Sequence, residues 1–351
     1  MAQKPRLVGV RYTDLSLASP DGVPAGRQAS LARPLRGPLP VVDVGRWRRH
    51  KERRITLGRV ADWEVHPSPR PRRLTARHWR LLSLLAEHGV LDTHQVRVLL
   101  FSSRATAYRH LSELYQAGLV LRFTMMDERS HLRRWELTGA GIEAIAEHLE
   151  AAGRPVPLGL EHRRGDVSFQ LVVNQFFTDM VASRQVTGGH LYRWRHRLDA
   201  AAWLRNHGVR HVDCDGYGRW IEQGTTVSFL FYLEIATYAV ELIENISNPT
   251  QVEPTSLSRI RATCRAAPAG LPVDVICVLA AEDAREQALW NRLDNLQLPV
   301  PVATTCPTAL DADPAGPAGA VWRTRDTPAR YRLVDLAGTA PISDSISREV
   351  P

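Results

Sequence analysis

The chain has 351 residues, of which 44% are hydrophobic, and a formal net charge of +8. This length accommodates two globular domains with tails. The sequence has no run of about 18 apolar residues and begins without the apolar core of a signal peptide, so we expect a cytoplasmic protein that does not span a membrane. The four cysteines, Cys214, Cys264, Cys277 and Cys306, form no CxxC pair. This spacing argues against a cysteine zinc site or a disulfide framework.

Residues 1–73 are interpreted as a basic, mostly disordered arm, because Pro and Gly are scattered through them and hydrophobic periodicity is weak. Residues 1–80 carry 18 Lys or Arg against 6 Asp or Glu, a net of +12, so the remainder carries −4. A short strand within Ile55–Val65 is the one ordered element that we consider here. A basic arm suits DNA, because neutralising phosphates releases counterions; a solvated tail without a partner is the alternative. The densest basic cluster comprises Arg46, Arg48, Arg49, Lys51, Arg53 and Arg54.

Residues 74–149 predict a winged helix-turn-helix: three helices, a two-stranded wing and a closing helix. Hydroxyl and carboxylate side chains cap helix N-termini, and glycine commonly follows a helix C-terminus. The expected caps are Thr75, Asp92 or Thr93, Ser102-Ser103 and Thr138, and the expected helix stops are Gly89 and Gly118. The wing is expected from strands Leu119–Phe123 and His131–Leu137 around a polar turn at Asp127–Ser130.

The third helix of this segment is expected to be the recognition helix. Its core face is assigned to Tyr108, Leu111, Leu114 and Tyr115. Its opposite face is basic, with short hydroxyl side chains near its start, as a helix needs when it meets phosphates and base edges in the major groove. The predicted DNA-binding residues are Ser103, Arg104, Thr106, Arg109 and His110 on the helix, and Arg129, Arg133 and Arg134 on the wing. A three-helix domain that binds protein or only dimerises is the alternative.

Residues 150–165 are expected to be a linker, 166–338 an α/β domain and 339–351 a tail. Continuous apolar strands separated by a helix predict partly parallel pairing with both faces covered. Gly216 and Gly218 favour a turn or bulge. The expected elements are a helix from Leu160 through Met180 that Gly188-Gly189 ends, strands at His190–Arg195, Thr226–Ile235, Pro272–Ala280 and Leu298–Thr304, and helices at Ser256–Ala266 and Glu282–Leu296.

Asp215 and Glu234 are the candidate catalytic residues. Carboxylates on adjacent strands can hold Mg²⁺, which activates water for phosphoryl transfer. The PD-(D/E)xK nuclease core also needs a lysine, but Ala236 occupies the expected place and no lysine follows Lys51. Arginine is a poor substitute because it does not deprotonate. We therefore expect a degenerate site with no bound metal or cofactor. In the purely structural interpretation, Asp215 caps a turn and Glu234 pairs with an arginine.

Several longer stretches, in their order along the chain, resemble the replication-relaxation family of plasmids and integrative elements in Gram-positive bacteria, especially actinobacteria. The resemblance covers roughly Leu74–Leu336. It rests on LLAEHGVLDTHQVRVLLF, SSRATAYRHLSELYQAGLV, WELTGAGIEAI, LEHRRGDVSFQLVVNQFF, the FYLE strand, VDVICVLAAEDAREQALWNRL and YRLVDL.

The resemblance implies a winged helix joined to a restriction-endonuclease-like α/β domain with a mixed sheet. It also implies a role in plasmid replication and relaxation of DNA topology. Cys214-Asp215 stands where the family has proline-aspartate, and Glu234-Ile235-Ala236 stands where it has glutamate-x-aspartate. Tyr238-Ala239-Val240 replaces the family's Gly-Thr-Glu. These departures put a nuclease or nicking activity in doubt.

The sequence therefore predicts a DNA-binding protein of a plasmid or mobile element, with double-stranded DNA as its partner. Replication or conjugation proteins and a second copy of the chain are the other partners considered. One alternative is a metal-dependent enzyme that nicks or relaxes DNA, for which Mg²⁺ is needed. Another is a winged-helix transcriptional regulator.

Overall fold

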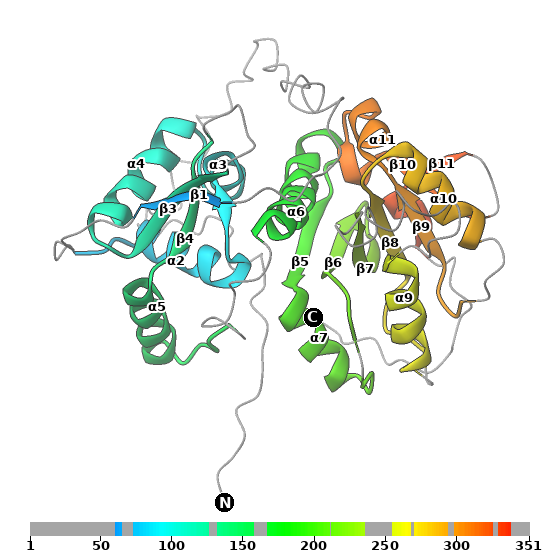
Figure 1. Cartoon of the computed structure of the whole chain (residues 1–351), viewed down its shortest axis with the longest axis horizontal. Coiled ribbons are helices and arrows are strands. Elements are labelled where there is room, and N and C mark those ends of the chain that lie inside the picture. The colour runs from blue at the N-terminus through cyan, green and yellow to red at the C-terminus, as the bar shows by residue number, and fades with distance from the viewer. Residues whose placement is uncertain are drawn as a thin grey trace, which may run out of the picture.

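The computed structural model describes residues 60–64, 73–125, 132–157, 167–210, 212–235, 255–267, 270–293, 298–325 and 329–337. The described chain is a mixed α/β structure with two sheets, one of four strands and one of seven. Figure 1 shows the two sheets with helix α6 (Val167–Thr187) between them. No helix in these ranges is both long and apolar enough to span a bilayer.

The first group of elements, here called the helical segment (residues 73–157), has the predicted order. Thr75, Asp92, Ser103 and Thr138 cap its four helices through their side chains, so the predicted helix starts are confirmed. Its elements are α2 (Ala76–His88), β2 (Leu91–Asp92), α3 (Thr93–Leu100), α4 (Arg104–Gln116), β3 (Val120–Met125), β4 (Arg134–Leu137) and α5 (Gly139–Ala151).

Strand β1 (Val60–Glu64) extends the small sheet, whose order is β1-β3-β4-β2. It pairs antiparallel with β3, in the region where a short strand was considered. The rest of the basic arm, the turn at Asp127–Ser130 and the C-terminal tail lie outside the described residues. Beneath the sheet, apolar side chains of α2, α3 and α4 pack around Trp135, whose indole Nε1 donates to Thr93 Oγ1 at 3.0 Å. This hydrogen bond satisfies the one polar atom of a fully buried ring.

The second group of elements, here called the large-sheet segment (residues 167–337), begins with α6, which ends at Thr187 before Gly188-Gly189 as predicted. The seven strands follow the order β11-β10-β9-β8-β7-β6-β5. Its other elements are β5 (His190–His196), α7 (Arg197–Asn206), β6 (Gly216–Glu222), β7 (Thr225–Glu234), α9 (Thr255–Arg265), β8 (Val275–Ala280), α10 (Asp283–Leu293), β9 (Val302–Thr305), α11 (Pro307–Ala312), β10 (Ala320–Arg323) and β11 (Arg330–Arg332), with 3-10 turns at Gly316–Ala318 and Leu333–Leu336.

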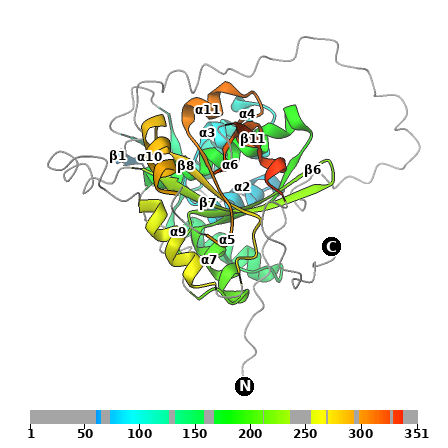
Figure 2. The same ribbon diagram turned by 90° about the vertical axis from the view of Figure 1, so that its right-hand side faces the viewer.

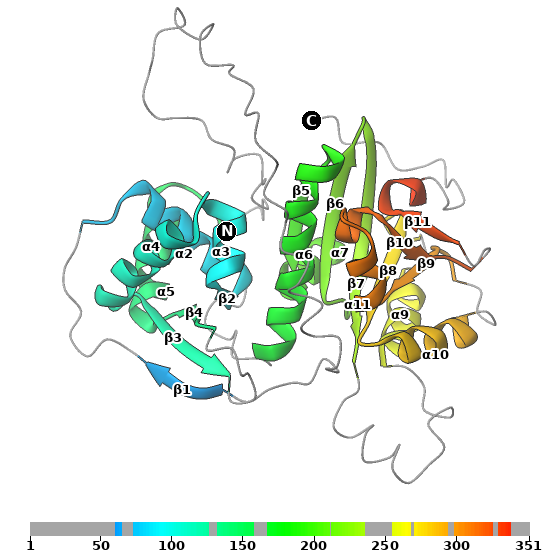
Figure 3. The same ribbon diagram turned by 90° about the horizontal axis from the view of Figure 1, so that it is seen from above.

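Both faces of the large sheet are covered, which explains its continuous apolar strands. Strand β8 pairs parallel with β7 and β9, and all six of its residues are buried, so the predicted parallel pairing is confirmed. Aromatic side chains of α6, including Phe176 and Phe177, pack on one face. Helices α7, α9 and α10 cover the other face, as Figures 2 and 3 show from two directions.

The glycines of β6 correct one expectation, because Gly216 and Gly218 lie within the strand and form neither a turn nor a bulge. A Cβ atom on Gly218 would lie 2.1 Å from the Phe229 ring, and one on Gly216 would lie 2.9 Å from Phe177. Glycine is needed at these positions because aromatic rings occupy the space of a side chain. The stretch after β5, for which no element was predicted, forms helix α7.

Candidate functional site

The predicted acidic pair lies at one edge of the large sheet. Asp215 immediately precedes β6, and Glu234 is the last residue of β7. The two strands are antiparallel, with Gly216 opposite Phe231, so the start of β6 lies beside the end of β7. Only 1% of Asp215 and 2% of Glu234 is exposed. The two carboxylates therefore lie at the same edge of adjacent strands, with Asp215 before the start of β6 instead of after the end of a strand.

Asp215 is held by an arginine of helix α9. Arg259 Nη2 donates to Asp215 Oδ1 at 2.5 Å, and its Nη1 donates to Oδ2 at 3.0 Å. The Leu233 amide also donates to Oδ2, at 2.8 Å. Burial raises the pKa of Asp215, and the Arg259 guanidinium opposes that rise. Burial works against the charge of Arg259 too, but Asp215 and then Asp213 raise the pKa of Arg259 above its ordinary value.

Glu234 is contacted by the same helix and by α10. The Ser256 amide in the first turn of α9 donates to Glu234 Oε2 at 2.7 Å, and Arg285 Nη1 lies 3.9 Å from Oε1. An arginine thus pairs with each acid, as the structural interpretation expected for Glu234. In place of the turn cap expected for Asp215, the structure shows a bidentate ion pair. Ala236 and the following departures from the family pattern lie outside the described residues.

The exposed face of α4 carries several of the predicted DNA-binding residues. Ser103 caps the helix by accepting from the Thr106 amide at 3.1 Å, and Thr106 is half-buried beside it. Arg104 and Arg109 are exposed, one turn and a half apart along the helix. Positive side chains therefore follow the N-terminal half of α4, where the helix dipole also favours anions.

Tyr108 and Arg133 form a second part of that face. Tyr108, which the sequence assigned to the core, is 38% exposed. The Arg133 guanidinium carbon lies 5.4 Å from the centre of the Tyr108 ring, and its Nη1 donates to the Tyr108 hydroxyl. Arg133 is exposed just before β4. The contact brings a predicted wing residue onto the predicted recognition helix, and it adds an aromatic ring to the surface.

Two predicted DNA-binding residues are buried instead. His110 is 7% exposed, because it lies on the inward face of α4 with Ala107, Leu111 and Leu114. Arg134 is 4% exposed, because β4 is flanked there by Asp92 of β2 and Phe123 of β3; its Nη1 donates to the Leu132 carbonyl. Neither side chain is available to a DNA groove. Arg129 and the arm residues Arg46, Arg48, Arg49, Lys51, Arg53 and Arg54 lie outside the described residues.

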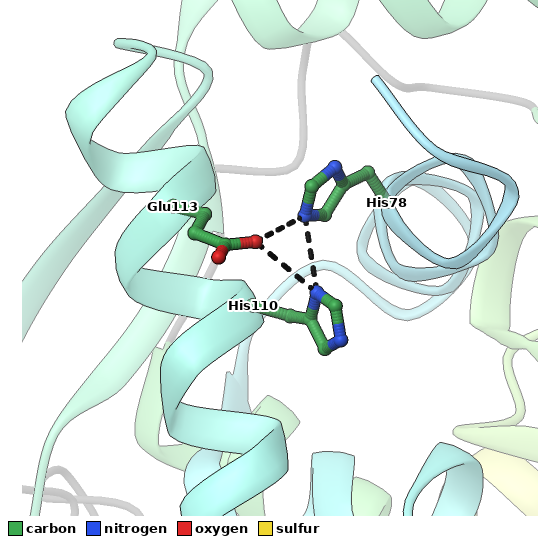
Figure 4. A group of neighbouring side chains, drawn as sticks. All are labelled: His78, His110 and Glu113. Carbon is green, nitrogen blue, oxygen red and sulfur yellow. Dashed lines mark hydrogen bonds and ion pairs between the residues drawn. The ribbon is translucent and has the colours of Figure 1, made fainter. Parts of the chain in front are cut away.

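His110 belongs to a cluster that the sequence analysis missed. His78 Nε2 of α2, His110 Nδ1 and Glu113 Oε2 of α4 point toward one another (Figure 4). The Glu113 oxygen lies 2.8 Å from His78 Nε2 and 3.3 Å from His110 Nδ1, and the two ring nitrogens are 3.1 Å apart. Burial, then His78, lowers the pKa of His110. The sequence signal was His110-x-x-Glu113, because residues three apart on a helix share a face.

A cleft lies where α2 and α5 face β5 and α7. Two acids, Glu87 and Asp199, line this cleft together with aromatic and basic side chains. The tryptophans and arginines include Trp79, Arg80, Arg154, Arg193, Arg195 and Trp203. The Arg195 guanidinium carbon lies 5.7 Å from the centre of the Trp203 ring. Burial, then the like charge of Arg193, lowers the pKa of Arg195. The cleft is thus a second place where arginine and aromatic side chains meet.

Contacts beside this cleft join the helical segment to the large-sheet segment. Asn174 Nδ2 of α6 donates to the carbonyls of His88 at 2.9 Å and Val90 at 2.7 Å. The His88 ring stacks on Trp194 of β5 at 3.6 Å between ring centres. Gln95 Nε2 of α3 donates to the Leu171 carbonyl of α6 at 3.3 Å. Buried polar contacts of this kind fix orientation as well as contributing stability.

Comparison with known proteins gives one match. Residues 82–247 match the family described as replication-relaxation. The matched range runs from α2 past β7, so it includes the α4 face, the His78 partners on α4 and both acids of the sheet edge. No curated protein and no solved structure matches the chain.

Proposed function

Because residues 82–247 match the replication-relaxation family, we propose that this protein binds double-stranded DNA in the replication, topology or transfer of a plasmid or other mobile element. The observation that carries the proposal is the exposed face of α4. Ser103, Arg104 and Arg109 are exposed in the N-terminal half of that helix, and Arg133, just before β4, lies against Tyr108 of the same helix. Arginine both neutralises phosphate and hydrogen-bonds guanine edges, so this face fits duplex DNA.

The helical segment acts in this proposal as a winged helix-turn-helix. Helices α2, α3 and α4 are followed by the antiparallel pair β3 and β4 and then by α5, which is the order of such a domain. Helix α4 enters the major groove with its N-terminal half. Strands β3 and β4 belong to the wing, and the basic N-terminal arm holds phosphates on the same duplex.

The large-sheet segment serves as a scaffold with a restriction-endonuclease-like arrangement. Arg259 and Arg285 contact the two carboxylates that a nuclease of this kind needs for a metal ion. The aromatic and basic cleft between the two segments provides a second DNA contact. In this function the protein is cytoplasmic, needs no cofactor at the acidic pair of the large sheet, and meets replication or conjugation proteins or a second copy of itself on DNA.

DNA titrations at several salt concentrations test the proposal. Fluorescence anisotropy with labelled plasmid fragments should show binding that weakens with salt. The logarithm of the association constant should fall linearly with the logarithm of the salt concentration, by roughly 0.9 per phosphate contact. The double substitution Arg104→Ala and Arg109→Ala should lower affinity at least ~tenfold and make the slope shallower. Arg205→Ala, at an exposed arginine of α7, is the matched control and should bind normally. Equal affinity for the double variant and the control would refute the assignment of α4 as the recognition helix.

A metal-dependent nicking activity is the second candidate, favoured by the common position of Asp215 and Glu234 beside α9. Supercoiled plasmid incubated with the protein and Mg²⁺ or Mn²⁺ decides between the two. Relaxation that disappears in Asp215→Asn would show that the acids are catalytic and that the scaffold assignment is wrong. Unchanged supercoiling together with salt-dependent binding supports the DNA-binding function alone.

A further inference from the structure

We propose that His78, His110 and Glu113 bind a divalent transition-metal ion of the zinc class, which joins α2 to α4. The proposal does not rest on DNA binding. Within the described part of the chain, this is the group of His, Cys, Asp and Glu side chains in which three ligand atoms converge. Figure 4 shows the three side chains meeting between the two helices.

The distances fit a metal centre. His78 Nε2, His110 Nδ1 and Glu113 Oε2 form a triangle with sides of 2.8, 3.1 and 3.3 Å. Zinc binds imidazole nitrogen and carboxylate oxygen at about 2.0–2.2 Å in tetrahedral geometry, so its ligand atoms lie roughly 3.3 Å from one another. A small inward or outward shift of each side chain therefore places an ion at bonding distance from all three atoms. Two imidazoles and one carboxylate are a ligand set that suits zinc.

Hydrogen bonds among the three side chains do not satisfy all of their polar atoms. The Thr75 amide donates to His78 Nδ1 at 3.2 Å, which leaves the ring proton of neutral His78 on Nε2, inside the triangle. If His110 also carries its proton on Nδ1, two donors face each other at 3.1 Å. If His110 carries its proton on Nε2, the single proton on His78 Nε2 is shared between Glu113 and His110. The His110 Nε2 atom is then a buried donor without a hydrogen-bond partner. A cation satisfies the three converging atoms together.

Metal binding changes one contact at the start of α2. A metal on His78 Nε2 moves the ring proton to Nδ1, so the hydrogen bond from the Thr75 amide is lost. That loss weakens the helix cap without removing it, because Thr75 Oγ1 still accepts from the His78 amide. The fourth coordination position belongs to water on the side of Glu113, whose side chain is 29% exposed compared with 6% for His78 and 9% for His110.

The site has a structural consequence for α4. His110 and Glu113 lie one turn apart on that helix, and His78 lies in the first turn of α2. An ion coordinated by both helices fixes the rotation of α4 about its axis. The same rotation sets where Arg109, the residue before His110, points on the exposed face.

Cobalt titration of the full chain tests the proposal. Co²⁺ in a four- or five-coordinate nitrogen and oxygen site absorbs visible light strongly, whereas hydrated Co²⁺ absorbs weakly. The wild-type protein should show one saturable visible spectrum that Zn²⁺ displaces. Glu113→Gln, which keeps the shape of the side chain, should lower Co²⁺ affinity at least ~tenfold. Glu143→Gln on the exposed side of α5 is the matched control and should titrate as wild type.

A second measurement on the wild-type protein keeps the test decisive if Glu113→Gln folds poorly. Zn²⁺ should shift the ring resonances of His78 and His110 in a histidine NMR spectrum, and it should raise the melting temperature of the protein. Titrations that are the same in wild type, Glu113→Gln and Glu143→Gln would overturn the site, as would Zn²⁺ binding that leaves both histidine rings unshifted.

Discussion

Two sets of arginines, one on α4 and one beside the buried acids of the large sheet, have opposite surroundings. On α4, Arg104 and Arg109 are exposed. The one acid of that helix, Glu113, is half-buried and contacts His78 and His110. At the edge of the large sheet, Arg259 is drawn inward to Asp213 and to the buried Asp215. An exposed arginine contributes little to folding and is available to a ligand, whereas an arginine on a buried acid is needed by the fold. The local environment of each arginine, rather than the overall excess of positive charge, therefore separates the binding surface from the structural pair.

The largest effect is expected from breaking the buried ion pair. Arg259→Met should destabilise the protein by about 3–5 kcal/mol, because it leaves the Asp215 carboxylate buried without its cation. Chemical denaturation measures the loss. Arg265→Met, at an exposed position of the same helix, is the matched control and should change stability by no more than about 0.5 kcal/mol.

A second variant distinguishes a lost ion pair from lost packing. The double substitution Asp215→Asn and Arg259→Met removes both charges and should recover part of the stability. DNA affinity of the folded double variant should remain at the wild-type level, because α4 is unchanged. An Arg259→Met protein as stable as the Arg265→Met control would contradict the structural role of this arginine.

A smaller effect is expected in the packing of β6. Gly218→Ala should destabilise the protein by about 1–3 kcal/mol, because the new methyl group would overlap the Phe229 ring and the core would have to shift. Gly139→Ala is the control in the helical segment. A Cβ there meets nothing within 4 Å, and the residue begins α5, so the change should be neutral or slightly stabilising. Equal stabilities for the two alanine variants, again by denaturation, would show that the Phe229 ring does not need the glycine.

These residues also show what the sequence could predict. Helix caps such as Asp92 and Ser103 were identified because capping is a local interaction between residues two or three apart. The strands of the large sheet were identified because their apolar runs are continuous. Gly216 and Gly218 were misassigned because local turn propensity cannot reveal an aromatic ring from another element.

The exposed face of α4 was predicted only in part. Assigning Tyr108, Leu111, Leu114 and Tyr115 to the core placed His110 outside, whereas the helix is rotated so that Ala107 and His110 face inward. Helical spacing tolerates such a rotation, and a distant residue decides it: His78 on α2 contacts His110. The same limit applies to the acids. The apolar run of β7 predicted Glu234 at the end of a strand, but the partner of Asp215, Arg259, lies 44 residues further along the chain.

The smallest effect concerns the cysteines, all of which lie in the large-sheet segment and are buried. Burial raises the pKa of Cys214 to about 12 and that of Cys264 to about 11. In the unfolded chain these thiols ionise near their ordinary pKa of about 8.5. Their contribution to stability is therefore complete below pH ~8 and is lost as the pH rises from there toward the folded values.

Alkylation with iodoacetamide measures this protection. The folded protein should be alkylated slowly at pH 8. Its alkylation rate should not rise with pH as the thiolate fraction of a free cysteine does, whereas denaturant should expose all four thiols. Because no cysteine precedes Cys214, the reaction reports opening of the large-sheet segment and not of α4. Arg259→Met should therefore speed alkylation, while the double substitution Arg104→Ala and Arg109→Ala should not. Faster alkylation in the Arg104→Ala and Arg109→Ala variant would mean that the exposed arginines of α4 do contribute to the stability of the large-sheet segment, contrary to this prediction.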